Sequence, residues 1–128
     1  MSVLDMIRPA GRWAANAACA ENPGAFFSED IADQVKALAL CDVCPVSGSC
    51  LRSALAELLE GLPGAGEYGI RAGLRPEELT AGVRVLLREG LLGELIAAGV
   101  RMPDIVVALA PLVPERTVYR WAFKGGAA

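Results

Sequence analysis

Apolar residues recur every three or four positions along much of the chain, and no segment alternates apolar and polar residues as a half-buried strand does. Ile31, Val35 and Leu38 predict a helix that starts at residues 28–30 and runs to about residue 41. Pro45 closes this helix, because proline cannot continue the hydrogen-bond ladder.

A second strong apolar stripe consists of Leu51, Leu55 and Leu58, which predict a helix capped by Ser49 and ended by Gly61. The glycine- and proline-rich stretch 61–66 is expected to be a loop. Residues 67–74 are expected to form a tight turn whose glycines supply positive φ angles.

The last third of the chain predicts several shorter helices. Pro76 is expected to open a helix that extends to about Glu89, where Gly90 stops it. Further short helices are expected at 91–98, 103–109 and 115–123. Short helices separated by turns of three or four residues are typical of a helix-turn-helix.

Composition supports an all-α fold. The chain has 128 residues, of which 54% are hydrophobic and only 5% aromatic, so its core must consist mainly of Ala, Leu and Val. The patterns indicate two parts: residues 1–74, and a helical, helix-turn-helix-like segment at 75–128. The net charge of −3 argues against a protein that coats nucleic acid. Basic residues outnumber acidic ones only in 75–128, which makes that segment the better candidate for meeting DNA.

Neither a secretory signal nor an uncharged apolar stretch of the roughly 20 residues that span a bilayer is visible. We therefore expect a cytoplasmic protein that does not enter a membrane. In such a reducing compartment, clustered cysteines are more often metal ligands than disulfides.

The candidate chemistry is carried by four cysteines, Cys19, Cys41, Cys44 and Cys50, in a chain without histidine. Cys19 is expected to follow a short helix at 12–18. Four thiolates match the full ligand set of one tetrahedral zinc or one iron–sulfur cluster, and the spacing leaves both open, together with thiols that bind no metal. A thiol–disulfide oxidoreductase would use the C-x2-C pair, but the expected neighbouring βαβ pattern is missing.

The surroundings of the cysteines carry a resemblance to a known family. They include Trp13, the string Pro23-Gly24-Ala25-Phe26-Phe27, and the string Ala39-Leu40-Cys41-Asp42-Val43-Cys44-Pro45-Val46. Over about residues 10–80 the chain closely resembles the WhiB-like family of actinobacterial and actinophage transcription regulators. The resemblance implies a small helical bundle around one [4Fe-4S] cluster bound by the four cysteines. It also implies binding to the C-terminal domain of the primary sigma factor of RNA polymerase, and a cluster that responds to oxygen or nitric oxide.

The chain departs from the family in its glycine-rich turn. The family pattern G-[VI]-W-G-G corresponds to residues 69–73, where Arg71 replaces the tryptophan that packs against sigma and Ala72 replaces a glycine. The resemblance makes Trp13, Phe26, Phe27 and Arg71 candidates for sigma contact. The aromatic residues are equally explained as a shield for the cluster or as a small core.

The resemblance does not cover the C-terminal segment. If residues 115–123 form a recognition helix, Val118 and Trp121 face the interior. Four side chains on the outer side are then candidates for contact with phosphates or base edges: Arg116, Tyr119, Arg120 and Lys124. The alternative is a helical cap on the core with a solvated basic face.

No catalytic constellation is visible, since the chain has no histidine, no phosphate-binding loop and no cluster of carboxylates beyond a solvated acidic face. The sequence therefore predicts a transcription regulator rather than an enzyme, with a zinc-stabilised DNA-binding or adaptor protein as the second reading.

Overall fold

The computed structural model describes residues 2–62 and 69–127, apart from the side chains of Glu21 and residues 124–127. Seven α-helices occur in these residues: α1 (Val3–Ile7), α2 (Ile31–Asp42), α3 (Ser47–Glu60), α4 (Pro76–Leu86), α5 (Leu92–Ala97), α6 (Met102–Leu109) and α7 (Glu115–Ala127). Three 3₁₀ helices precede α2: η1 (Trp13–Asn16), η2 (Ala18–Glu21) and η3 (Pro23–Phe27). A π-helical segment, η4 (Leu87–Leu91), joins α4 to α5. No strand forms in the described residues, so the predicted all-α fold is confirmed.

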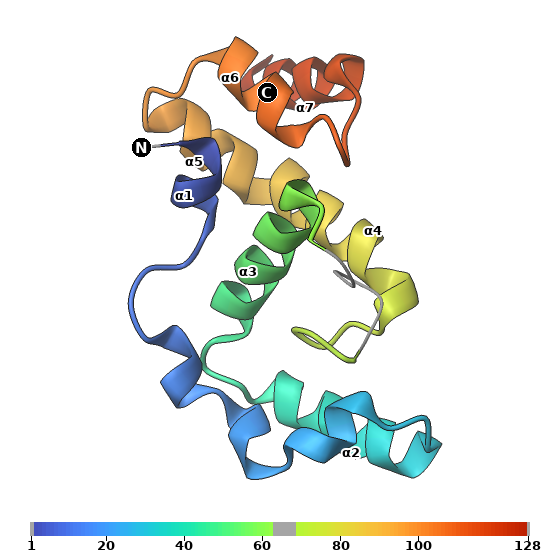
Figure 1. Cartoon of the computed structure of the whole chain (residues 1–128). Helices are drawn as coiled ribbons and strands as arrows, with labels where there is room; N and C mark the ends of the chain where they lie inside the picture. Colours follow the sequence, from blue (N-terminus) through green and yellow to red (C-terminus); the bar gives the residue numbers. More distant parts are fainter. Residues whose placement is uncertain (1, 63–68, 128) are drawn as a thin grey trace.

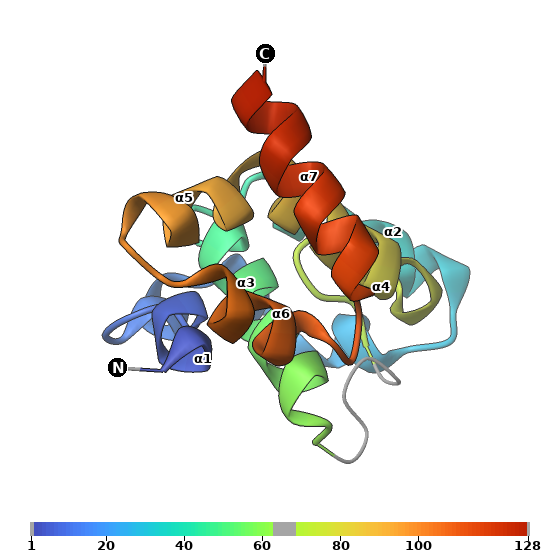
Figure 2. The same cartoon turned by 90° about the horizontal axis from the view of Figure 1, so that it is seen from above.

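The helix α3 connects the two ends of the molecule (Figure 1). At one end lie α2 and the 3₁₀ helices, and at the other end the continuous helix α4–η4–α5 crosses α3. The helices α6 and α7 lie beyond this crossing helix. Figure 2 shows α7 along the outer side of the molecule, where it packs against α5 and α6.

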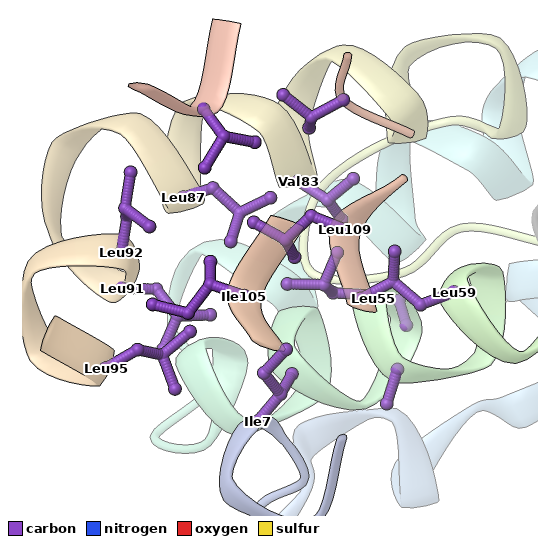
Figure 3. Close-up of a cluster of buried hydrophobic side chains, with 14 of the residues drawn as sticks. Ile7, Leu55, Leu59, Val83, Leu87, Leu91, Leu92, Leu95, Ile105 and Leu109 are labelled. Atoms are coloured by element: carbon purple, nitrogen blue, oxygen red, sulfur yellow. The ribbon is translucent and has the colours of Figure 1, made fainter. Parts of the chain in front are cut away.

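The main core is aliphatic and draws on every α-helix except α2 (Figure 3). Its buried residues are Ile7, Ala54, Leu55, Ala56, Leu59, Leu79, Val83, Leu87, Leu91, Leu92, Leu95, Ile105, Leu109, Val113 and Val118. Each fully buried Leu, Ile or Val stabilises the fold by roughly 1.5–3 kcal/mol. This core therefore fixes the N-terminal helix and the C-terminal segment to α3.

Polar contacts fix the short helix α1 to α3 as well. The side chain of Arg52 donates from Nε to the carbonyl of Ile7 (2.8 Å) and from Nη2 to the carbonyl of Met6 (2.6 Å). Arg8 forms an ion pair with Glu60 at the other end of α3. The two hydrogen bonds from Arg52 satisfy carbonyl groups at the C-terminal end of α1, which have no partner within the helix.

A second, much smaller core lies under α2. It consists of Ala25, Phe26, Ala37 and Ile70, with Leu38, Leu40 and Cys41 packed partly against it. Two of its four buried residues are alanines, so it removes little apolar area from water. Burial alone stabilises this end of the molecule far less than the other.

Several predicted helix ends are confirmed. Asp30 caps α2, accepting a hydrogen bond from the backbone N–H of Ala32 (2.9 Å). Gly61 ends α3 in the left-handed conformation with φ of 68°, and Pro76 is the first residue of α4. The described part of the predicted turn, from residue 69 onward, has the expected positive φ at Gly69 and Gly73. Residues 63–68 lie outside the described residues.

Gly90 does not stop a helix, contrary to the prediction. The chain continues through η4 into α5, so the predicted separate helix at 91–98 is an extension of α4. A glycine inside a helix costs only about 1 kcal/mol relative to alanine. The buried side chains of Leu87, Leu91 and Leu95 outweigh that cost, and a π-turn keeps all three in the core.

Two local predictions in the cysteine region are also wrong. The helix α3 begins at Ser47, not after a cap at Ser49, and Val46 at its N-cap makes no side-chain hydrogen bond. The backbone N–H of Cys50 already donates to the carbonyl of Val46 (2.9 Å), which places Ser49 inside the first turn. The predicted helix at 12–18 is only the 3₁₀ helix η1, followed by Ala17 in an extended conformation.

No helix within the described residues is by itself long and apolar enough to cross a membrane; α2 and α3 together reach that length but meet at an angle of 111°.

We predict that Ile105→Ala on α6 destabilises the protein by about 2–5 kcal/mol, because Ile105 is fully buried in the main core and its loss leaves a cavity. Val107→Ala on the same helix is the control, since Val107 is 75% exposed and should change stability by less than about 0.5 kcal/mol. Urea unfolding followed by circular dichroism measures both. Equal effects of the two changes would contradict the packing of α6 on the core.

Candidate metal centre

The four cysteines come from η2, α2, α3 and the turn between α2 and α3. Cys19 lies on η2, Cys41 in the last turn of α2, Cys44 just beyond that helix, and Cys50 in the first turn of α3. The N–H of Cys44 donates to the carbonyl of Cys41 (3.2 Å), which keeps both side chains on the same turn. The bend of 111° between α2 and α3 brings Cys50 back toward them.

All four cysteines line one cavity of about 300 Å³. The four sequence-predicted sigma-contact residues, Trp13, Phe26, Phe27 and Arg71, line the same cavity. Most of the other lining residues are small or aliphatic: Ala14, Ala17, Ala20, Pro23, Leu40, Val46, Ser47, Ile70 and Ala72. The structure therefore brings the four cysteines and the four candidate sigma-contact residues together at one cavity, whereas the sequence identified them as separate groups.

Polar N–H groups lie beside three of the four cysteines. The backbone N–H of Ala18 donates to Sγ of Cys44 (3.5 Å), and the backbone N–H of Gly73 lies close enough to Cys41 to act to lower the pKa of its thiol. The side chain of Arg71 lines the cavity together with Cys50, whose proximity helps to raise the pKa of the guanidinium. N–H groups aimed at thiolate sulfur are the usual surroundings of a metal-bound cysteine, so the donor set fits a cluster or a soft metal.

The electrostatics of the site favour a bound cation. Burial raises the pKa of the Cys41 thiol, and the nearby Cys50, Cys44 and Cys19 raise it further, while the N–H of Gly73 acts in the opposite direction. Four thiolates around one cavity repel each other unless positive charge lies between them. A metal centre supplies that charge.

The four cysteines line the cavity from different elements. Within residues 2–62 and 69–127, no three Cys, Asp or Glu side chains are arranged to hold a single metal ion. A tetrahedral zinc would need all four sulfur atoms at about 2.3 Å from the metal.

A tight turn at 69–74 closes one side of the cavity. Ile70 donates from its N–H to the carbonyl of Phe26 (2.9 Å), and Arg71 and Leu74 exchange two backbone hydrogen bonds of 2.9 Å. Gly69 has φ of 77°, and a Cβ there would lie 2.8 Å from the ring of Phe27. Ala72, at a position where the family pattern has glycine, adopts φ of 51°, a conformation that costs a residue with a side chain about 1–2 kcal/mol.

The aromatic residues of the cavity differ in exposure. Phe26 is 7% exposed and belongs to the small core, and Trp13 is partly exposed. Phe27 is 71% exposed, at the rim. Of these three side chains, Phe27 offers the most surface to a partner.

Sequence reasoning missed Glu57, which forms an ion pair and a hydrogen bond with Arg71. The two residues are 14 positions apart on different elements, so no spacing rule connects them. The N–H donors of Ala18 and Gly73 were missed as well, because a backbone group leaves no signal in residue type.

The predicted DNA-contact residues lie on α7, at the end of the molecule away from α2 (Figure 1). Arg116 and Arg120 are exposed, and the ring of Tyr119 stacks on Phe123 with centroids 5.8 Å apart. The side chain of Lys124 lies outside the described residues. Val118 is fully buried and Trp121 packs against the core, as predicted, with the guanidinium of Arg84 5.4 Å from the Trp121 ring centroid.

The fold and the site define a small all-α protein with a four-cysteine cavity at one end and a pair of short helices at the other. The family model described as "Transcription factor WhiB" matches residues 13–81, and the chain belongs to this family of transcription factors. The match includes all four cysteines and the turn at 69–74, and it ends within α4. No curated protein and no solved structure matches the chain.

Proposed function

We propose that this chain is a transcription regulator that holds one [4Fe-4S] cluster through Cys19, Cys41, Cys44 and Cys50. The observation that carries the proposal is that these four side chains line one cavity, in which the backbone N–H of Ala18 donates to the sulfur of Cys44. When bound, the cluster supplies a redox-active, oxygen- or nitric-oxide-sensitive group. Four thiols are the ligand set of such a cluster and also of one zinc ion, so a zinc-stabilised protein is the alternative.

The cysteines also tie together the part of the fold that has the least apolar support. Cys19, Cys41 and Cys50 come from η2, α2 and α3, and the core between these elements has only four buried residues. We therefore expect metal binding to supply part of the folding free energy of residues 9–46, as it does in other small metal-binding domains. Release of the metal would loosen this end and leave the main core folded, which is the physical basis of a switch.

We predict that the chain reconstituted anaerobically with iron and sulfide is brown, with charge-transfer absorbance in the visible range. A single Cys→Ser change at position 19, 41, 44 or 50 should lower cluster content severalfold, because serine is a much poorer ligand for iron than a thiolate. Ser47→Ala, at another residue that lines the cavity, is the matched control and should retain the cluster. A colourless protein that binds one zinc per chain would contradict the proposal.

The surface beside the cavity supports a protein partner, which we propose to be the C-terminal domain of the primary sigma factor. Ile31 and Val35 are 74% and 57% exposed and lie four residues apart on one face of α2, and Phe27, at the end of η3, is 71% exposed at the cavity rim. Contiguous exposed apolar surface of this kind marks interaction sites. In the proposed complex, Trp13, Phe26 and Arg71 form the wall behind Phe27.

Phe27→Ala should weaken binding to the sigma C-terminal domain at least tenfold, because an exposed aromatic side chain that becomes buried in an interface often contributes 2 kcal/mol or more. Cluster absorbance should be unchanged. Phe123→Ala is the matched control, since Phe123 is 64% exposed but lies on α7. Copurification and calorimetric titration measure both variants, and equal affinities would exclude Phe27 from the interface.

We further propose that the C-terminal part, residues 75–128, acts as a helix-turn-helix unit that contacts promoter DNA through α7. The arrangement of α6, a short turn and α7 supports this, as do the exposed Arg116 and Arg120 on one face of α7. Tyr119 and Lys124 would complete that face. The protein would act in the cytoplasm, as a binding protein and not as an enzyme.

The double change Arg116→Gln, Arg120→Gln should weaken DNA binding and make it less dependent on salt, with a decrease of about 2 in the slope of log K against log salt. Arg88→Gln is the control, because Arg88 is exposed on η4 at a distance from α7 in sequence. Gel shifts at several salt concentrations provide the slope. If the double variant retains the affinity and the slope of the original chain, α7 is a helical cap and not a DNA-binding helix.

A further inference from the structure

The side chain of Arg71 forms part of the wall of the cavity. Its side chain is 28% exposed and lines the cavity together with Cys50. The backbone of Arg71 is held by two hydrogen bonds of 2.9 Å, one from its N–H to the carbonyl of Leu74 and one from the N–H of Leu74 to its carbonyl. These two bonds fix the backbone from which the side chain of Arg71 extends.

Two residues of α3 lie near the guanidinium of Arg71. The carboxylate of Glu57 pairs with it, and Cys50 lines the same cavity as Arg71, close enough to help raise the pKa of the guanidinium. Cys50 and Glu57 are seven positions apart, two turns of one helix, so they lie on the same face of α3.

The contact keeps a positive charge beside a proposed ligand. Burial acts to lower the pKa of Arg71, but Glu57 and the nearby Cys50 outweigh it and raise the pKa further above its ordinary value. The guanidinium is therefore charged at any physiological pH. By contrast, the N–H groups of Ala18 beside Cys44 and of Gly73 beside Cys41 are neutral backbone groups.

A charged donor has a larger effect on a metal centre than a neutral one. Hydrogen bonds to the ligand sulfur atoms and local charge both set the reduction potential of an iron–sulfur cluster. A cation next to one sulfur stabilises the reduced state more than the oxidised state, because the reduced state carries one more negative charge.

We propose that Arg71 holds a positive charge beside Cys50 that raises the reduction potential of the bound cluster. This inference rests on the proposed function, since it assumes that the four cysteines hold the cluster. It assigns to Arg71 an intramolecular role that does not require a protein partner.

The test is a potentiometric titration of the reconstituted full chain, followed by its visible absorbance. Each molecule takes up one electron from the mediator solution. Arg71→Gln should lower the potential and shift the oxidised-to-reduced ratio about tenfold, which corresponds to about 59 mV for a one-electron couple. Arg75→Gln is the matched control, because Arg75 is a nearby arginine that pairs with Glu78 and does not line the cavity. Its potential should equal that of the unchanged chain.

Arg71→Lys provides a second variant in case Arg71→Gln takes up no cluster. Lysine retains the charge but not the planar guanidinium, so we expect a smaller shift in the same direction. Thermal unfolding of the metal-free variants, measured in parallel, reports any purely structural role. A potential in both Arg71 variants equal to that of Arg75→Gln would overturn the inference while the cluster itself remains established. Failure of the unchanged chain to take up a cluster would overturn the proposed function and this inference together.

Discussion

The packing of aliphatic side chains around α3 is the interaction on which the other parts of this molecule depend. Leu55 and Leu59 anchor the C-terminal half of α3 in the main core, while the first turn of the same helix carries Cys50. Ile7 anchors the segment that leads to Cys19 in that core as well, and Arg52 reinforces the anchor with two hydrogen bonds. The core thus holds both ends of the segment that carries the four cysteines.

The two ends of the molecule are stabilised in different ways. The end with α4–η4–α5, α6 and α7 buries a large set of Leu, Ile and Val side chains and needs no ligand to do so. The end with α2 has a four-residue core and four thiols around a cavity. Because repulsion among thiolates opposes the closure of that cavity, a bound cation and the fold of this end should stabilise each other. Such a division suits a regulator in which one part responds and the other remains constant.

Several features of the site could be read from residue types. The cysteine spacing, the capping by Asp30, the stop at Gly61 and the positive φ angles at Gly69 and Gly73 follow from local chemistry. The continuation of the helix through Gly90 could not be predicted from local chemistry, because the burial of leucines on both sides outweighs the intrinsic cost of one glycine. The start of α3 at Ser47 was missed for a similar reason: a backbone hydrogen bond to Val46, and not a side-chain cap, begins the helix.

The sequence by itself determined the helical class, the aliphatic character of the core and the four thiols, because helix periodicity, residue size and side-chain chemistry are local properties. It also identified the aromatic residues and the arginine of the turn, but as separate candidates. Only the tertiary structure decided that all eight side chains line one cavity, that Phe27 is exposed and Phe26 buried, and that Arg71 reaches Glu57 and Cys50. These facts depend on the bend between α2 and α3 and on contacts between residues far apart in sequence, for which no local pattern exists.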